Sequence, residues 1–563
     1  MPTPEALFDS HRARLEAAVA ATASRGYFSA YPESPSPRVY GENAAADGLA
    51  AFRSWSGSDF PVLTPGAAGS VGGERSPFGP DLGVRYPRVR PEGIDELLAA
   101  ARAAMPAWRD AGPRGRVGVC LEVLARLHAR VFELANAVMH TSGQAFVMAF
   151  QAGGTHALDR ALEALAYAWA GMTRHPERVV WEKPGRGEPE RVEKTFTPVG
   201  RGVGLVIGCN TFPTWNSWPG LFASLATGNA VVVKPHPSAV LPLAITVQAA
   251  QQVLTEAGLD PALVTLAAED PADRLAAVLA VRPEVALVDF TGSTTFGSWL
   301  ESNATQAQVF TEKAGVNTVV IDSTDDFAGM CANLAHSLSL YTGQMCTTPQ
   351  NILLPAQGIP TDEGHKTPAE VVAGIRSGMD RLLGEDARAV ELLGAVVSDA
   401  VLSRLEASAA GGDVLVASRP VTHPSFPQAR VRTPTLVAVD VADEATYARE
   451  CFGPVSYLVR TGSTSESLEC LARTVAEHGA MTAAVYSTDP QVLREAERIA
   501  LQVGVSLSEN LTGGTYVNQS AAFSDFHGSG ANPAANASFT DDAFVASRFR
   551  IIEVRRRLPA STG

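Results

Sequence analysis

The chain has 563 residues, of which 46% are hydrophobic and 18% are charged, and its formal net charge is −14. This length exceeds what one hydrophobic core fills and predicts two or three domains, while the composition is that of an ordinary globular protein. The negative charge argues against a general affinity for nucleic acids or anionic membranes. We therefore expect neither a nucleic acid nor a membrane among the partners.

The sequence lacks the patterns typical of export, membrane insertion and metal binding. Its first stretch, MPTPEALFDSHRARLEAAVAATASRG, mixes acidic and basic residues and predicts an amphipathic helix rather than a signal peptide. No apolar run approaches the roughly 18 residues that span a bilayer. The six cysteines include no CxxC pair, so we expect neither a disulfide framework nor a zinc site. These features predict a cytoplasmic protein without a metal.

The first elements in chain order are helices and a hairpin. A Gly/Pro/Ser-rich stretch at 64–87 predicts a surface loop. After it, PEGIDELLAAARAAMPAW and RVGVCLEVLARLHARVFELANAVMH repeat apolar residues with a helical period. The polar, charge-alternating stretch around 179–198 predicts a hairpin with Pro-Gly at its turn.

From Val203 onward, short apolar strands alternate with helices. VGLVIG, NAVVVKP, LVTLAA and EVALVDFTG are the strands of a first series, and a second series runs from NTVVID to AMTAAVYST. In the second series we expect a helix that ends at Cys346. RFRIIEVRRRLP predicts a last strand with basic flanks. Strands and helices at this spacing predict an α/β fold with two doubly wound domains and a small, separate β element.

Two residues of the second half could carry covalent chemistry. Cys346 lies in SLYTGQMCTTPQN, among turn-forming polar residues. It is either a small buried filler or a nucleophile that reacts as its thiolate. Glu312, in VFTEKAG, is either an exposed loop carboxylate or a general base whose pKa partial burial would set.

Other residues could bind a cofactor or stabilise an oxyanion. In FTGSTTFG, Gly292 and Ser293 follow a strand and open a helix, which fits either a pyrophosphate cradle or an ordinary helix cap. Lys234 ends the strand VVVKP, at the edge where doubly wound folds bind ligands, or it is a solvated strand end. Asn210 and Asn216 could each donate to an oxyanion or cap the next helix.

Taken together and in order, these motifs resemble the aldehyde dehydrogenase superfamily over nearly all of the chain beyond about residue 95. The resemblance rests on CN at Asn210, TGNAVVVKP with Asn229 and Lys234, FTGSTTFG with Gly292 and Ser293, TEKAG with Glu312, GQMC with Cys346 and ECFGPV with Glu450.

The resemblance implies NAD(P)-dependent oxidation of an aldehyde to a carboxylic acid through a cysteine thioester. Cys346 would be the catalytic thiol and Glu312 the base that activates water. Their separation of 34 residues is the one that the family uses. Counting back from the GN motif favours Asn210 over Asn216 as the oxyanion donor, with Thr211 as one extra residue.

The resemblance also implies that Lys234, Gly292, Ser293 and Glu450 bind the cofactor. The family has an acidic residue three positions after the lysine, where this sequence has Pro237. An acidic side chain repels a 2′-phosphate, so its absence predicts NADP in preference to NAD. Lys234 and His236 are then the expected positive partners of the phosphate.

By the same resemblance, residues 1–178 and 199–313 form an N-terminal extension and a dinucleotide-binding domain, and 314–540 form the catalytic domain. Residues 179–198 and 541–563 form an oligomerisation element, which predicts a homodimer or a homotetramer. Near the C-terminus, FSDFHGSG departs from the family's Phe-Gly-Gly element, because a serine and an aspartate replace the glycines.

Within the superfamily, the long N-terminal extension and YTGQMCTTPQN are most similar to the PaaN branch of phenylacetate catabolism. That likeness implies a semialdehyde substrate, with or without a linked CoA. Two alternatives stay open. One is a CoA-acylating dehydrogenase, against which Glu312 counts, because such enzymes usually lack the glutamate. The other is a catalytically silent oligomeric homologue, against which the joint presence of Cys346, Glu312 and Asn210 counts.

Overall fold

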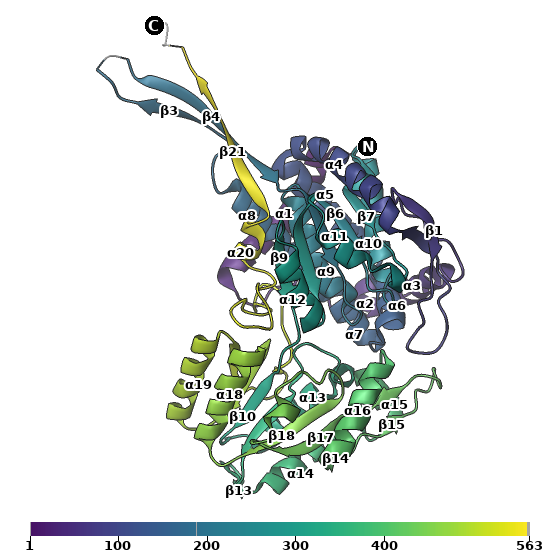
Figure 1. The fold of residues 1–563 in the computed structure, drawn as a ribbon, viewed down its shortest axis with the longest axis vertical. Helices are drawn as coiled ribbons and strands as arrows, with labels where there is room; N and C mark the ends of the chain where they lie inside the picture. The colour runs from purple at the N-terminus through teal and green to yellow at the C-terminus, as the bar shows by residue number, and fades with distance from the viewer. Residues whose placement is uncertain (1, 187, 560–563) are drawn as a thin grey trace.

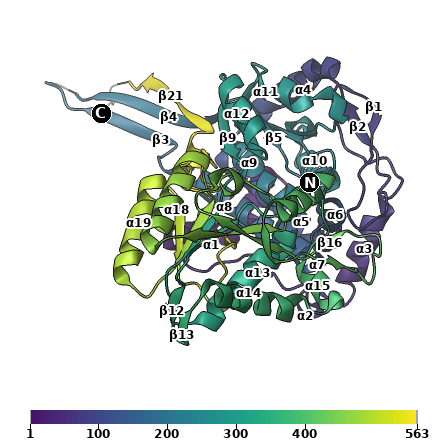
Figure 2. The ribbon, with the colours of Figure 1, turned by 60° about the horizontal axis from the view of Figure 1, so that its bottom comes forward.

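The computed structural model describes residues 2–186 and 188–559. Two α/β units lie one above the other, and a thin β arm projects from the upper one, as Figures 1 and 2 show from two directions. This arrangement confirms the predicted fold class of two parallel-sheet units with a small β element. None of the helices within the described ranges has the length and hydropathy needed to cross a bilayer.

The upper unit is built on a five-stranded parallel sheet in the order β7-β6-β5-β8-β9. Its strands are β5 (Val203–Ile207), β6 (Ala230–Lys234), β7 (Val264–Leu266), β8 (Val285–Thr291) and β9 (Gln308–Glu312). The helices between and beside them are α9 (Pro213–Ala226), α10 (Leu241–Glu256), α11 (Leu275–Ala280) and α12 (Thr294–Asn303). Valine-rich strands of this kind suit a sheet that helices cover on both faces.

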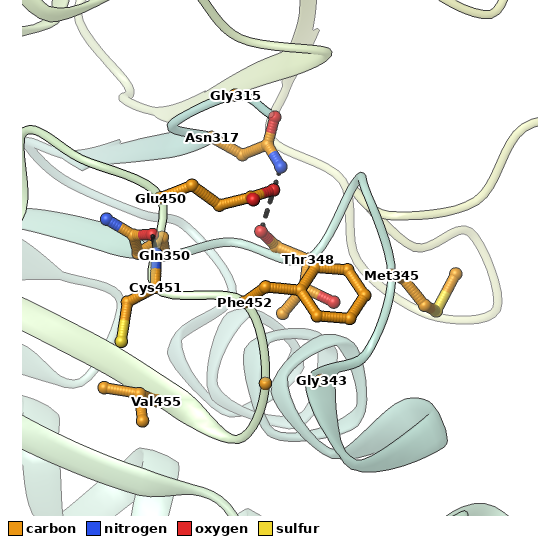
Figure 3. A pocket seen from close by; sticks show the side chains of 11 residues that line it. Gly315, Asn317, Gly343, Met345, Thr348, Gln350, Glu450, Cys451, Phe452 and Val455 are labelled. Carbon is orange, nitrogen blue, oxygen red and sulfur yellow. Dashed lines mark hydrogen bonds between the residues drawn. The ribbon is translucent and has the colours of Figure 1, made fainter. Parts of the chain in front are cut away.

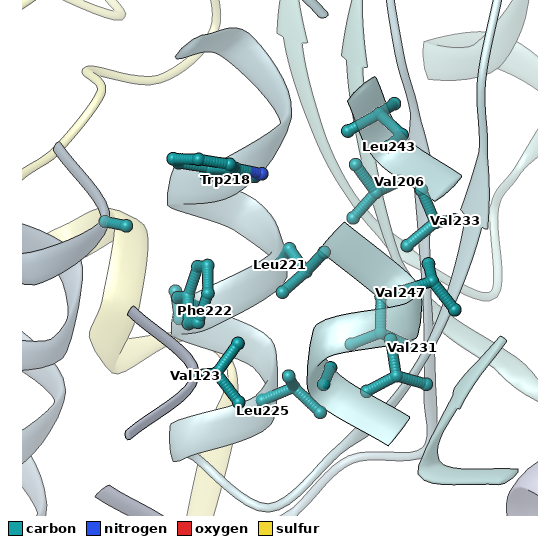
Figure 4. Close-up of a cluster of buried hydrophobic side chains, with 14 of the residues drawn as sticks. Val123, Val206, Trp218, Leu221, Phe222, Leu225, Val231, Val233, Leu243 and Val247 are labelled. Carbon is teal, nitrogen blue, oxygen red and sulfur yellow. The ribbon is translucent and has the colours of Figure 1, made fainter. Parts of the chain in front are cut away.

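The core of this unit forms where α9 and α10 meet the sheet (Figure 4). Trp218 and Phe222 of α9 are fully buried, as are Val231 and Val233 of β6 and Val247 of α10. Burying an aromatic or branched side chain stabilises the fold by about 1.5–3 kcal/mol. This packing fixes α9, whose first turn reaches the site described below.

The N-terminal extension packs helices around this unit. Its long helices are α1 (Pro4–Ser24), α3 (Ala44–Ser54), α4 (Ile94–Asp110), α5 (Gly112–Ala129), α6 (Val131–Ser142) and α8 (His156–Thr173), and the short ones are α2 (Pro37–Tyr40) and α7 (Phe146–Phe150). Strands β1 (Ala67–Val71) and β2 (Tyr86–Val89) pair antiparallel. Most of 64–87 is loop as its composition predicts, but β1 lies within that stretch, because β2 supplies a partner that local composition does not reveal.

The lower unit is built on a seven-stranded sheet in the order β14-β17-β18-β11-β10-β19-β20. All pairs are parallel except β14 with β17. The strands are β10 (Thr318–Ile321), β11 (Asn351–Pro355), β14 (Asp413–Val416), β17 (Thr435–Asp440), β18 (Val455–Thr461), β19 (Thr482–Tyr486) and β20 (Ser506–Glu509). The main helices are α13 (Phe327–Ser339), α14 (Pro368–Leu383), α16 (Asp399–Gly411), α18 (Thr464–His478) and α19 (Pro490–Val503).

Short elements complete the lower unit and the C-terminal region. They are α15 (Asp386–Leu392), α17 (Glu444–Tyr447), α20 (Asp542–Ala546) and the two-stranded pairs β12 (Ile359–Thr361) with β13 (Gly364–Lys366) and β15 (Pro420–Val421) with β16 (Val431–Arg432). After β20 the chain returns toward the upper unit in a long loop, which passes between the two sheets (Figure 1).

The arm consists of β3 (Arg178–Lys183), β4 (Glu190–Gly200) and β21 (Phe549–Arg557), in the antiparallel order β21-β4-β3. The predicted hairpin is confirmed as β3 and β4. β21 pairs along nearly the whole of β4, from Phe549 opposite Gly200 to Arg557 opposite Val192. Two segments that are far apart in the sequence thus form one sheet outside the body (Figure 2).

Candidate active site

Cys346 lies in a turn of the lower unit, and the prediction of a helix ending at this residue is wrong. Helix α13 ends at Ser339, and Tyr341, Thr342 and Gly343 then have φ values of 53°, 55° and 65°. Three consecutive left-handed residues cannot continue a right-handed helix. The chain therefore leaves the helix early and presents the thiol from an irregular loop.

Buried contacts hold this strained loop in place. The hydroxyl of Tyr341 donates to the carbonyl of Ser142, and the Thr342 hydroxyl donates to the carbonyl of Gly394 at 2.7 Å. Both side chains are fully buried. Left-handed non-glycine residues persist only where the surroundings impose them, and they gather at functional sites.

Asn317 connects the loop to the sheet. Its amide donates to the carbonyls of Cys346 at 2.7 Å and Thr348 at 3.0 Å, while its oxygen accepts from the N–H groups of Met481 and Thr482 at 2.9 and 3.1 Å. One buried side chain at the start of β10 thus fixes the peptide that carries the thiol.

Cys346, Glu312 and His527 meet between the two units. The Cys346 Sγ, a carboxylate oxygen of Glu312 and a ring nitrogen of His527 all lie within 4.8 Å of one another. The His527 Nε2 is 3.6 Å from Sγ and 3.2 Å from the Glu312 Oε1. Glu312 ends β9 of the upper sheet, Cys346 belongs to the lower unit, and His527 comes from the returning loop. The structure thus brings together the predicted nucleophile and base, and it adds a histidine.

Asn216 and Asn210 take different positions. Asn216, in the first turn of α9, donates its amide to the Glu312 Oε2 at 2.8 Å. Asn210, in the loop after β5, donates to the carbonyl of Thr141 at 3.0 Å. An asparagine amide has two N–H groups, so this bond leaves Asn210 one donor for another acceptor. Its role in binding an oxyanion stays a prediction.

Burial and charge shift the two acid groups of the cluster in opposite directions. Burial and the neighbouring Glu312 carboxylate raise the pKa of the Cys346 thiol well above its usual range. Burial alone would raise the pKa of Glu312, but His527, Cys346 and Asn216 outweigh it and bring this pKa below its usual range. At neutral pH the site therefore holds an ionised carboxylate next to a thiol that resists ionisation.

Glu450 lines a small pocket together with Asn317, Met345 and Thr348 (Figure 3). Burial raises the pKa of Glu450 to about 7, and the charge of Glu312 acts in the same direction. In the same pocket, the buried hydroxyl of Thr348 has no hydrogen-bond partner among the described residues. The pocket has a volume of only about 20 Å³, which is room for one water molecule, so a role of Glu450 in binding a cofactor stays a prediction.

Lys234 ends β6 as predicted, but it is not a free positive charge. It is buried and forms an ion pair with Glu269, which is also buried and in addition accepts from the N–H of Leu275 at 2.6 Å. Burial and the charge of Lys234 lower the pKa of His236 to about 4. Sequence reasoning missed Glu269, because it lies 35 residues after its partner and in no recognisable motif.

Gly292 and Ser293 lie where β8 gives way to α12. The hydroxyl of Ser293 accepts from the N–H of Phe296 at 3.4 Å and so caps the helix. A Cβ on Gly292 would lie 2.7 Å from the ring of Phe290, so this position has no room for a side chain unless the ring moves. The cap is present, and a role in binding pyrophosphate stays a prediction.

His527 is the residue of this cluster that sequence reasoning missed. It lies in FSDFHGSG, where the replaced glycines are conspicuous but a single histidine is not. Gly528, with φ of 70°, follows it and permits the sharp turn. The only sequence signal was a polar side chain in a stretch rich in glycine and serine.

Comparisons with known proteins agree with this geometry. The model of the aldehyde dehydrogenase family matches residues 74–538. N-succinylglutamate 5-semialdehyde dehydrogenase of Chromobacterium violaceum is 27% identical over 385 residues, which are 67% of this chain and 73% of that protein. Geranial dehydrogenase of Castellaniella defragrans is 27% identical over 413 residues, which are 72% and 80% of the two chains.

A solved structure agrees more closely. The crystal structure of an NAD-dependent aldehyde dehydrogenase from Burkholderia multivorans is 55% identical in sequence, with a TM-score of 0.96. The match covers 98% of this chain and 99% of that one. The family match extends over most of the chain and includes all the predicted site residues. The chain belongs to the aldehyde dehydrogenase family.

Proposed function

We propose that this aldehyde dehydrogenase oxidises its substrate to a free carboxylic acid, with Cys346 as nucleophile and Glu312 as the base that releases the product. The observation that carries the proposal is the cluster in which the half-buried thiol and the buried carboxylate lie within 4.8 Å of each other. A nucleophile and a base in such proximity are what hydrolysis of a covalent intermediate requires.

In the first step the Cys346 Sγ bonds to the carbonyl carbon of the aldehyde, and the carbonyl oxygen becomes an oxyanion. The N–H of Cys346 and the free N–H of Asn210 are the proposed donors to this oxyanion. Removing one such donor typically lowers the rate by about 10²–10³.

The proposed binders of a nicotinamide dinucleotide are the Glu450 carboxylate and the unpaired Thr348 hydroxyl in the lower unit, Lys234 at the end of β6, and Gly292 with Ser293 between β8 and α12. When bound, this cofactor accepts the hydride and thereby oxidises the substrate. Glu312 is ionised at neutral pH and can accept the proton of the water that hydrolyses the thioester. The acid then leaves and the Cys346 thiol is restored.

The first experiment measures reduced nicotinamide with a panel of aliphatic, aromatic and CoA-linked semialdehydes, with and without free CoA. We expect turnover to a free acid without CoA, identified by mass. Cys346→Ala should fold and lose about 10³-fold or more in kcat, and Glu312→Gln should accumulate the thioester. Cys470→Ala, which removes a buried cysteine of α18, is the matched control.

The results discriminate between the alternatives. An absolute requirement for CoA with a thioester product would favour a CoA-acylating enzyme and exclude Glu312 as the deacylating base. If neither cofactor is reduced with any substrate and Cys346→Ala changes nothing, the chain is a silent homologue.

For the cofactor, the observed charges favour NAD, whereas the motif alone favours NADP. The argument for NADP needs positive charge at Lys234 and His236, but Glu269 pairs with the lysine, and the pKa of His236, at about 4, leaves that ring neutral. A buried carboxylate there also repels a 2′-phosphate. We expect a higher kcat/KM with NAD than with NADP. In Glu269→Gln, the ratio of kcat/KM with NAD to kcat/KM with NADP should be smaller. A preference of the unmodified enzyme for NADP would contradict this.

For the substrate, we propose a semialdehyde of phenylacetate catabolism. The support is the sequence likeness to the PaaN branch, together with the similarity to an N-succinylglutamate 5-semialdehyde dehydrogenase. In the panel above, a kcat/KM for a CoA-linked semialdehyde at least tenfold above that for simple aldehydes would support the proposal.

A further inference from the structure

One nitrogen of His527 lies between the nucleophile and the carboxylate. Its Nε2 is 3.6 Å from the Cys346 Sγ, within the range of a hydrogen bond to sulfur, and 3.2 Å from the Glu312 Oε1. The ring is only 4% exposed and the Glu312 side chain 1%. His527 and Glu312 are thus shielded from bulk water and Cys346 is half-buried. Contacts between charged groups are stronger in such surroundings than in bulk water.

The surroundings fix the ring of His527. Its plane meets the ring of Trp215 nearly edge to face, with 4.5 Å between the centroids. Its backbone pairs with Phe539, whose N–H donates to the His527 carbonyl at 2.9 Å. Trp215 and Asn216 are neighbours on α9, so the helix that orients Glu312 also orients the histidine. Packing and backbone hydrogen bonds thus hold the His527 ring in one orientation.

The thiol needs a positively charged or basic neighbour. Only the thiolate attacks an aldehyde readily, and both burial and the Glu312 charge oppose its formation. Glu312 is a poor base for this proton, because its contacts hold the pKa of its carboxyl below the usual range. Of the described side chains within hydrogen-bonding distance of the sulfur, His527 is the one that can carry a positive charge.

We propose that His527 is a catalytic residue that takes the proton of Cys346 and holds it between sulfur and carboxylate. The S–H bond breaks, an Nε2–H bond forms, and no electrons are exchanged. The resulting imidazolium lies next to two negative charges, the thiolate and the Glu312 carboxylate, which stabilise it. Once formed, the Nε2–H can donate to the Glu312 Oε1, 3.2 Å away, so Glu312 stabilises the imidazolium during attack. The proposal rests on the function proposed above, because it takes Cys346 as the nucleophile.

Other titratable or charged groups face this cluster, and the experiment below must distinguish each of them from His527. Burial raises the pKa of the Cys209 thiol, in the loop after β5, to about 11, and Glu450 titrates at about 7. The guanidinium of Arg160 on α8 lies over the Trp215 ring, 5.3 Å from its centroid. Mass mapping of individual cysteines separates Cys346 from Cys209, and a Glu450→Gln background removes the titration of that carboxyl.

The test measures the rate at which iodoacetamide alkylates Cys346, followed by peptide mass mapping from pH 5.5 to 10, with no aldehyde or cofactor present. We expect the unmodified enzyme to be alkylated at pH 7 in spite of the burial and the Glu312 charge that oppose ionisation of the thiol. His527→Gln should react at least tenfold more slowly at pH 7, with the midpoint of its profile moved to higher pH. His140→Gln, which removes another buried histidine, is the matched control and should keep the original profile.

Equal alkylation profiles for the His527→Gln variant and the unmodified enzyme would overturn the proposal. If His527 had only a structural role, its replacement would lower the stability of the fold but leave the pH midpoint of alkylation unchanged. Thermal unfolding is therefore recorded for each variant. If His527→Gln does not fold, the thiolate absorbance of the unmodified enzyme is compared with that of Cys346→Ala from pH 5.5 to 10. A thiolate signal at pH 7 supports the ion pair, and its appearance only above pH 9 excludes it.

The proposal and the broader function fail in different ways. If the enzyme oxidises aldehydes but His527→Gln has the same alkylation midpoint as the unmodified enzyme, His527 is rejected as the proton acceptor. Cys346 then remains the proposed nucleophile. If His527→Gln moves the alkylation midpoint to higher pH as expected, but the enzyme oxidises no aldehyde, the Cys346–His527 pair is supported and the proposed reaction is rejected.

Discussion

At the scale of single residues, the site combines groups whose pKa values are moved far from their ordinary ranges. Burial and Glu312 oppose ionisation of Cys346, while burial places the pKa of Glu450 near 7. Perturbed groups of this kind gather where a reaction needs them. The two shifts make distinct predictions, because Cys346 is proposed to act on the substrate and Glu450 to bind the cofactor.

Cofactor affinity should depend on pH through Glu450. Its pKa of about 7 means that the carboxylate, the better hydrogen-bond acceptor, is lost as pH falls below 7. We therefore expect the Kd for the cofactor, measured by fluorescence titration between pH 6 and 8.5, to fall as pH rises through 7. Glu450→Gln should bind more weakly at pH 8 and show no such step.

Glu553→Gln, on the arm, is the matched control and should retain the step. A Kd for the unmodified enzyme that is constant from pH 6 to 8.5 would show that the Glu450 carboxylate does not contact the cofactor.

Prediction from sequence succeeded where a residue stands in a motif and failed where it acts across the fold. Cys346 and Glu312 were found because family motifs surround them, and the structure does bring them together. His527 and Glu269 were missed, because their partners lie far away in sequence and become neighbours only after folding. Local pattern carries no information on such pairs.

At the scale of elements, a buried ion pair attaches the arm to the upper sheet. Arg548, just before β21, makes two parallel hydrogen bonds to Asp289 of β8, at 2.6 and 2.8 Å. Both side chains are buried, and Arg548 also donates to the Ser224 hydroxyl at 2.9 Å. Such a pair gives orientation more than net stability, but loss of one partner leaves an unpaired buried charge.

Arg548→Met should therefore lower the free energy of unfolding by about 3–5 kcal/mol. The double variant Arg548→Met with Asp289→Asn should recover part of this loss, because no charge stays unpaired. Urea unfolding followed by tryptophan fluorescence measures both changes. Arg550→Met, two residues along and exposed, is the control, and an equal loss for it would contradict the prediction.

Regular elements were predicted more reliably than their ends. The alternation of strands and helices from Val203 onward was read correctly, because apolar periodicity is a local property. The end of α13 was misplaced by several residues, because the left-handed turn at Tyr341 depends on a contact with Ser142 in a distant helix. Tertiary contacts thus decided the conformation of the segment that carries the nucleophile.

At the scale of the whole molecule, the arm exposes apolar side chains on its outer strands. Val179, Val180 and Trp181 of β3 and Ile551, Ile552 and Val554 of β21 are between 38% and 57% exposed. β3 and β21 are also the two edges of this sheet. Exposed apolar edges are surfaces through which copies of a chain associate.

We expect a homodimer or a homotetramer in solution, formed through the arm. Light scattering at micromolar concentration should give at least twice the chain mass, and Ile552→Asp should give a monomer. Val278→Asp places the same charge on an exposed valine of α11, away from the arm, and should leave the assembly intact. A monomeric unmodified protein would refute the role of the arm.

The separate origins of the catalytic cluster impose an order on the maturation of the enzyme. Glu312 closes the upper sheet, Cys346 belongs to the lower unit, and His527 arrives in the loop that returns to the interface. During synthesis from the N-terminus, domains fold as they emerge, and His527 follows both Glu312 and Cys346 in the chain. Under the proposed role of His527, a chain that ends before this residue would hold its cysteine in the unreactive, protonated form, and the thiol would become reactive only when the returning loop is folded.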